Sequence, residues 1–211
     1  MLKIYSFTFN PFSENTYILA DETMECLIID PGCYSQEEKN ELEGFIIREK
    51  LKPVRILLTH THIDHVLGNN FLTGKFDLPI QMSFIEKSML EAAKEYGKMW
   101  GIEMEPSPPP QMDVTENTSV SFGNTLLKPL FTPGHSPGSF SYLHKESKSL
   151  ICGDVLFMQS IGRTDLPGGD YNTLIRSIKE KVLPLGDDIV VYSGHGPQTT
   201  IGEERNNNPF L

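Results

Sequence analysis

Short apolar runs alternate with amphipathic segments along the whole chain. In the first half they predict strands at residues 2–9, 16–20, 26–29, 54–58 and 79–82, and helices at residues 36–49, 66–71 and 84–99. In the second half they predict strands at residues 119–122, 125–131, 139–144, 149–152 and 188–192, and a helix at residues 172–182. Residues 106–110, Pro-Ser-Pro-Pro-Pro, are expected to be irregular, because proline lacks an amide hydrogen. Interleaved strands and helices predict an α/β or layered α+β fold, and 211 residues suit a single domain over 1–211.

The composition is ordinary for a globular protein, with 38% hydrophobic and 22% charged residues. No apolar run approaches the roughly 20 residues that span a bilayer, and residues 1–5 alternate like a strand instead of resembling a signal peptide. We therefore expect a cytoplasmic protein without a membrane partner. The net charge of −10 and the lack of a basic stripe argue against nucleic acid. Three cysteines without a CxxC pair predict no disulfide framework, and no signal indicates an oligomeric state.

A dense group of metal-binding side chains follows the strand predicted at residues 54–58. It consists of His60, His62, Asp64 and His65, four ionisable groups within six residues. Buried at the end of a strand, such groups would repel one another or stay unpaired without a cation. Imidazole nitrogen and carboxylate oxygen suit first-row metals, zinc above all, with iron or manganese as alternatives. The group therefore predicts a metal centre.

Three further candidate ligands stand at strand ends or in turns rich in glycine and proline. They are His135, Asp154 and His195, each with a glycine beside it that lets the backbone approach closely. Taken alone, each is more often a structural residue, a hydrogen-bonded histidine or a turn aspartate. Together with the first group they make seven ligands, more than one tetrahedral ion requires. Two metals about 3.5–4 Å apart are therefore plausible.

Five motifs resemble, in order, those of the metallo-β-lactamase superfamily, and they cover nearly the whole chain. The motifs are Asp30-Pro31-Gly32, the His60-x-His62-x-Asp64-His65 group, Pro-Gly-His-Ser-Pro-Gly-Ser at residues 133–139, Cys152-Gly153-Asp154 and Ser193-Gly194-His195-Gly196. The resemblance implies an αββα sandwich, in which two mixed β-sheets are flanked by helices and the metals lie at one edge.

Carried over residue by residue, the resemblance also implies a ligand set. The first metal takes His60, His62 and His135, and the second takes Asp64, His65 and His195. Asp154 bridges the two metals, and Asp30 supports the site from behind the ligands. True β-lactamases usually carry cysteine or serine where Asp154 stands, so antibiotic hydrolysis is disfavoured.

The segment Gly-Arg-Thr-Asp-Leu-Pro-Gly-Gly-Asp at residues 162–170 resembles that of small hydrolases similar to hydroxyacylglutathione hydrolase, or glyoxalase II. Few residues follow His195, so we expect the C-terminal region that holds glutathione in full-length glyoxalase II to be missing. Within the segment, Arg163 is a candidate to bind a substrate carboxylate through its planar fork. Equally, Arg163 is a candidate for a structural ion pair with Asp165 or Asp170.

The leading hypothesis is a metal-dependent hydrolase acting on a small-molecule thioester or related acyl compound. Two divalent metal ions, most simply zinc, would lower the pKa of a bridging water from 15.7 to about 7 and so supply hydroxide as the nucleophile. A metal would stabilise the developing oxyanion, and Asp64 is the catalytic candidate that orients the hydroxide or relays its proton.

Two other functions remain open from the sequence. One is a mononuclear iron oxygenase of the persulfide dioxygenase type, which keeps the same motifs and is understood to use only the ligands that match His60, His135 and Asp154. The other is RNA processing, which relatives of this superfamily perform. The net charge of −10 and the missing basic patch weigh against RNA.

Overall fold

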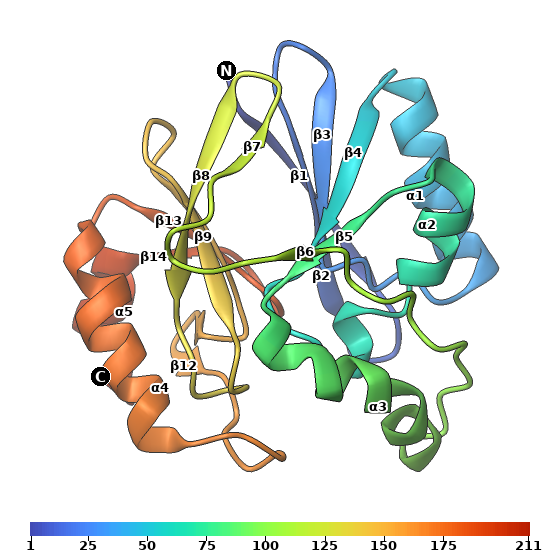
Figure 1. Cartoon of the computed structure of the whole chain (residues 1–211). Helices are drawn as coiled ribbons and strands as arrows, with labels where there is room; N and C mark the ends of the chain where they lie inside the picture. Colours follow the sequence, from blue (N-terminus) through green and yellow to red (C-terminus); the bar gives the residue numbers. More distant parts are fainter. The chain divides into compact units, whose positions relative to one another are not determined.

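The strands of the chain form two mixed β-sheets of six strands each and one small two-stranded sheet (Figure 1). A computed structural model describes residues 1–211. The residues divide into two compact units. Unit 1 comprises Met1–Asp113 and Ser121–Thr125, and unit 2 comprises Val114–Val120 and Leu126–Leu211.

The sheet of unit 1 has the strand order β1-β2-β3-β4-β5-β6, antiparallel from β1 to β3 and parallel from β3 to β6. Its strands are β1 (Lys3–Phe9), β2 (Glu14–Ala20), β3 (Glu25–Ile29), β4 (Lys52–Leu57), β5 (Ile80–Met82) and β6 (Met112–Asp113). Every side chain of β2 is buried, and so are the last four of β3. These central strands therefore read as continuous apolar runs, as expected where both faces of a sheet are covered.

Three helices cover this sheet: α1 (Gln36–Arg48), α2 (Asn69–Phe76) and α3 (Lys87–Met99). Ile46 of α1, Leu72 of α2 and Leu90 of α3 join Ile28 and Ile56 of the strands in one hydrophobic core. Two single turns of 3-10 helix, η1 (Ile63–His65) and η2 (Phe84–Glu86), precede α2 and α3. The first turn, η1, carries Asp64 and His65, two members of the histidine group formed by His60, His62, Asp64 and His65.

The second six-stranded sheet has the order β14-β13-β10-β9-β8-β7. Its strands are β7 (Val120–Phe122), β8 (Thr125–Phe131), β9 (Phe140–His144), β10 (Ser149–Gly153), β13 (Val190–Ser193) and β14 (Thr199–Thr200). The tip of the β7–β8 hairpin, residues 121–125, is counted with unit 1. Only β10 and β13 are parallel neighbours, so the carboxyl ends of these two strands lie at the same edge.

Unit 2 completes its core with α4 (Tyr171–Ser177), η3 (Ile178–Val182), η4 (Leu183–Leu185) and α5 (Ile201–Asn207). Leu174 of α4, Val182 of η3 and Ile201 of α5 pack with Leu150 and Val191 of the strands. The small sheet pairs β11 (Leu156–Phe157) with β12 (Ser160–Ile161). Every helix of the chain is too short or too polar to span a lipid bilayer.

Most of the predicted elements are confirmed, and the differences lie at short elements and helix ends. The helix predicted at residues 66–71 begins three residues later, because residues 66–68 form a turn after η1 and α2 begins at residue 69. The helix predicted at residues 172–182 is α-helical only to residue 177 and continues as the wider turn η3. The periodicity did not reveal β6, β11, β12, β14 or α5.

All three cysteines are free and buried. Burial raises the pKa of Cys26, Cys33 and Cys152 to about 12, because a thiolate is poorly solvated inside the protein. Their role is packing, as small apolar side chains.

Candidate metal centre

The histidine group of unit 1 emerges where β4 ends and is largely buried. His60 and His65 are 1% and 0% exposed, whereas His62 and Asp64 are half-buried. The ring centroid of His60 lies 4.1 Å from that of His65 and 4.8 Å from that of His62. His65 Nε2 lies 3.7 Å from Asp64 Oδ2. The four predicted ligands of this segment are therefore gathered in one place.

Asp30 joins this group from the end of β3. It is buried, and its possible ligand atom lies within 4.8 Å of those of His60 and His65. Its Oδ1 accepts from Thr59 N at 2.7 Å and its Oδ2 from Thr59 Oγ1 at 2.5 Å. His65 Nδ1 lies 3.1 Å from the same Oδ2. If Nδ1 donates to Asp30, the neutral ring presents a lone pair at Nε2, which is how a partner behind a ligand fixes its tautomer.

A second carboxyl group stands behind His65, and sequence reasoning missed it. Glu14, the first residue of β2, is 0% exposed, and its Oε1 lies 3.9 Å from His65 Nδ1. Thr16 Oγ1 donates to its Oε2 at 2.9 Å. Burial raises the pKa of Glu14 well above its usual range, partly offset by His65. Asp30 and Glu14 thus both face the same ring nitrogen.

The backbone between His60 and His62 is held by a third buried carboxylate, that of Glu86. Its Oε2 accepts from Thr61 N at 3.2 Å and from Thr61 Oγ1 at 2.9 Å. Glu86 ends η2, far along the chain from the histidines, and no local motif marks it. The His60-x-His62 segment is therefore fixed by its central residue.

In unit 2, Asp154 lies between the two histidines that were predicted there. Its Oδ2 is 3.4 Å from His135 Nε2 and 3.6 Å from His195 Nε2. Asp154 and His195 follow the parallel strands β10 and β13, which explains why they meet at one edge. On its other side, His135 Nδ1 lies 2.7 Å from the carbonyl oxygen of Arg163.

The loop that carries Arg163 packs closely on Asp154. A Cβ atom on Gly162 would lie 1.9 Å from the carbonyl oxygen of Asp154, so only glycine fits there. The Arg163 side chain is turned to Asp165 in a bidentate pair, with Nε–Oδ1 and Nη2–Oδ2 distances of 2.7 Å each. The hydrogen bond with Arg163 lowers the pKa of Asp165 to about 2. Arg163 thus forms the ion pair that was one of its two predicted roles, and its backbone supports His135.

The donor set in each unit fits a borderline divalent cation. Two ligand atoms held about 2.0–2.2 Å from a tetrahedral ion lie about 3.4 Å apart. The separations of 3.4 and 3.6 Å around Asp154 and of 3.7 Å between Asp64 and His65 are close to that value. They exceed the roughly 2.9 Å typical of an N–H···O hydrogen bond. Histidine nitrogens and carboxylate oxygens are also the ligands that zinc and iron accept.

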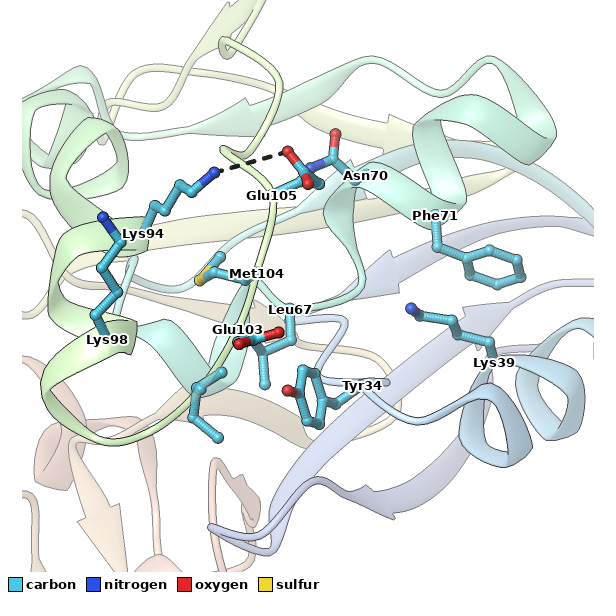
Figure 2. A pocket seen from close by; sticks show the side chains of 11 residues that line it. Tyr34, Lys39, Leu67, Asn70, Phe71, Lys94, Lys98, Glu103, Met104 and Glu105 are labelled. Atoms are coloured by element: carbon cyan, nitrogen blue, oxygen red, sulfur yellow. Dashed lines mark ion pairs between the residues drawn. The ribbon is translucent and has the colours of Figure 1, made fainter.

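Unit 1 also has a pocket of about 670 Å³ beside the ligand-bearing loops (Figure 2). Tyr34, Leu67, Phe71 and Met104 form its apolar lining, together with Ile102. Three lysines and two glutamates surround this lining: Lys39, Lys94, Lys98, Glu103 and Glu105. Figure 2 shows the single ion pair among them, Lys94 to Glu105, at 3.8 Å. The opposite charges leave the rim without a clear preference for anions or cations.

Comparisons with known proteins agree with this metal-binding geometry. A family model described as the metallo-beta-lactamase superfamily matches residues 9–195. Among curated proteins, hydroxyacylglutathione hydrolase GloC of Haemophilus influenzae is 37% identical, over 95% of this chain and 93% of its own length. Other relatives are named only as probable metallo-hydrolases.

Two solved structures are similar over almost the full chain. One is the B3 metallo-β-lactamase BLEG-1, with a TM-score of 0.91 and 38% identity, covering 99% of each chain. The other is TTHA1623 in a di-iron-bound form, with a TM-score of 0.89 and 35% identity, covering 98% of this chain and 100% of that one. They confirm the predicted fold class, a layered α/β fold of two mixed sheets with flanking helices. The chain therefore belongs to the metallo-β-lactamase superfamily, whose relatives here are named as metallo-hydrolases, and its histidines and aspartates form groups that could hold divalent metal ions.

Proposed function

We propose that this protein hydrolyses a small-molecule thioester or related acyl compound at a centre of two divalent cations, most simply zinc. The proposal depends above all on Asp154. One of its carboxylate oxygens, Oδ2, lies from both His135 and His195 at the distance expected between two ligands of the same metal ion. A carboxylate placed in this way suits two metal ions about 3.5–4 Å apart, the spacing of two-metal hydrolytic sites.

The ligands divide between the two cations as the superfamily resemblance implies. His60, His62 and His135 would hold the first cation, Asp64, His65 and His195 would hold the second, and Asp154 would be shared. Two observations support this division. The side chains of His60, His62, Asp64 and His65 lie close together, and the distance between Asp154 and His135 suits two ligands of one ion. The di-iron form of TTHA1623 supports a two-metal site and makes iron the main alternative to zinc.

Bound cations supply an activated water at neutral pH and polarise the carbonyl group that is attacked. The residues of the chain supply the rest. Asp64, half-buried beside His65, would orient the attacking hydroxide or relay its proton. Asp30 keeps His65 in one tautomer, and Glu86 fixes the backbone between His60 and His62. No serine or cysteine nucleophile is needed, which agrees with the three buried, inert thiols.

The substrate class is inferred from chemistry and similarity together. GloC, named as a hydroxyacylglutathione hydrolase, supports a thioester as substrate. The net charge of −10 supports a small molecule over nucleic acid. We further propose a cytoplasmic protein that works as one domain over residues 1–211, without a membrane partner.

Metal analysis combined with a substrate panel tests the proposal. Protein purified without added metal is expected to carry two divalent ions per chain and to hydrolyse acyl thioesters, among them S-lactoylglutathione and simple acyl-thiol esters. A chelator should abolish the activity, and zinc should restore it.

Three results would contradict the proposal. One iron per chain with oxygen consumption on a persulfide would assign an oxygenase. Faster turnover of a β-lactam than of any thioester would assign a lactamase, a result that the similarity to BLEG-1 makes worth measuring. Cleavage of RNA at low salt would assign RNA processing.

A further inference from the structure

One amide group bridges two of the loops that carry ligands in unit 1. Asn10 follows β1, and its Nδ2 donates to the carbonyl oxygens of Gly32 and Asp64, each at 3.0 Å. Gly32 belongs to the loop after Asp30, and Asp64 lies in η1 between His62 and His65. A side-chain amide has two N–H groups, so Asn10 can serve both carbonyls at once.

Asn10 is itself held firmly by the β1–β2 turn and by α1. Its Oδ1 accepts from Phe12 N at 3.0 Å, and its own N–H donates to Glu38 Oε1 at 2.7 Å. Glu38 also closes the capping box of α1 with Ser35. The backbone of Asn10 has φ +55°, a left-handed conformation that asparagine tolerates better than most residues. The amide is therefore fixed on its acceptor side and by its backbone.

The two bridged loops approach too closely for a side chain at Gly32. A Cβ atom there would lie 2.6 Å from Asn10 Nδ2, 2.7 Å from the Asp64 carbonyl oxygen and 2.0 Å from Glu14 Oε2. The glycine of the Asp-Pro-Gly motif thus makes room for the bridge. The Asn10 hydrogen bonds therefore depend on the absence of a side chain at Gly32.

We propose that Asn10 is a positioning residue for the second cation, acting through Asp64 and His65. By fixing the carbonyl of Asp64 against the Asp30 loop, it sets where the side chains of Asp64 and His65 project. The inference rests on the metal ligands of the proposed function and does not depend on the substrate. Outer partners of this kind typically change metal affinity by about 10–100-fold when they are replaced.

The variant Asn10→Asp tests this assignment because it removes the two donors without changing the size of the side chain. It keeps the shape, the Oδ1 acceptor and the tolerance of positive φ, and it removes both N–H donors. It also adds a negative charge, which by Coulomb attraction would strengthen cation binding. We expect the opposite result. In a zinc titration of the metal-free protein against a chromophoric chelator, one of the two binding steps should weaken about 10–100-fold. The other step should change less than about threefold.

Asn70→Asp provides the matched control, because it makes the same change in the same unit. Asn70 Nδ2 donates to the Pro106 carbonyl at 2.6 Å and bridges no ligand loops, so both zinc steps should match the wild type. Asn10→Gly removes the whole side chain while permitting the positive φ, and it should reproduce the loss. In the cobalt-substituted protein, the visible spectrum of the second bound ion should change for Asn10→Asp and not for Asn70→Asp.

The outcomes separate this inference from the proposed function. If the wild type binds two ions and Asn10→Asp binds both equally well, only the role of Asn10 is overturned. Equal weakening of both steps would show a general structural role and would also overturn it. Failure of the wild type to bind any divalent ion overturns both proposals together.

Discussion

The two units assemble their ligands in opposite ways. In unit 1, four ligands come from one continuous stretch, and residues from elsewhere hold that stretch in place: Asp30, Glu86 and Asn10. In unit 2, three ligands come from three separate strand ends, and they contact one another through Asp154. Unit 1 thus distributes the support of its ligands over several neighbours, whereas unit 2 concentrates it in one carboxylate. Single substitutions should therefore be most damaging in unit 2.

The largest effect is expected for Asp154→Ala. It removes the one group that faces both His135 and His195, so it should remove one bound ion and lower kcat/KM by more than the roughly 100-fold that loss of an outer partner costs. Metal content and steady-state kinetics measure both. Asp188→Ala, which removes only an exposed partner of Lys148, is the control. Wild-type metal content and rate in Asp154→Ala would refute the ligand assignment.

A smaller effect is expected for Asp30→Asn in unit 1. The amide oxygen can still accept from Thr59 N, but an NH2 group replaces Oδ2, the atom that faces His65 Nδ1, and an NH2 group can only donate. Metal affinity should fall about 10–100-fold, with stability less affected. Asp21→Asn is matched to it, because Asp21 is similarly buried in unit 1 and its side chain accepts from Thr23, Asn124 and Thr125, none of which is near a predicted ligand in sequence. If Asp21→Asn weakened metal binding as much, the effect would be global and not due to His65.

Gly162→Ala tests how tightly the loop of unit 2 is packed on its central ligand. The new methyl group would meet the backbone of Asp154 at 1.9 Å, so the loop or the ligand must shift. We expect a loss of about 1–3 kcal/mol of unfolding free energy and reduced turnover. Gly44→Ala in α1 has no atom within 4 Å of its Cβ position, and it should gain up to about 1 kcal/mol because alanine favours the helix. Denaturant unfolding measures the stability of both variants. Equal stabilities of Gly162→Ala and Gly44→Ala would contradict the close packing of the Gly162 loop on Asp154.

The smallest effect is expected for Arg163→Ala. Its guanidinium is engaged by Asp165 at the surface, and its support of His135 comes from the backbone, which alanine keeps. KM and the thermal midpoint should change little, by less than about threefold for KM, because exposed ion pairs contribute little. A tenfold rise in KM at unchanged stability would instead show that Arg163 contacts the substrate.

The sequence predicted the elements whose patterns are long and the ligands that follow strands. The strand before His60 and the parallel pair before Asp154 and His195 were recognisable, because apolar runs that end in glycine and a polar residue have a clear pattern. Asn10, Glu14 and Glu86 were not recognisable. They reach the ligand-bearing segment only through the fold, from positions 25 to 54 residues away in sequence, where they contact Thr61, Asp64 and His65.

The missed secondary structure has a similar explanation. Strands of two residues, such as β11 and β14, are too short for any periodicity. The helix α5 did carry a local signal, since Thr200 caps it by accepting from Glu203 N, a threonine followed three residues later by glutamate. The start of α2 was predicted too early because the apolar residues Val66 and Leu67 lie in the turn that follows η1, and the helix itself begins at Asn69.

The buried cysteines have a consequence for the proposed thioester hydrolysis, which would release a thiol. Because their pKa values are about 12, almost none of the folded protein carries a thiolate at neutral pH. Thiol–disulfide exchange requires the thiolate, so a released thiol that becomes oxidised cannot form a mixed disulfide with the folded chain. Cys33 lies in the loop that follows Asp30, and its sulfur packs against Gly68, where an added Cβ atom would lie 2.6 Å from it. Alkylation of Cys33 therefore requires that this loop opens, and its rate would report the opening of the metal-binding loops themselves.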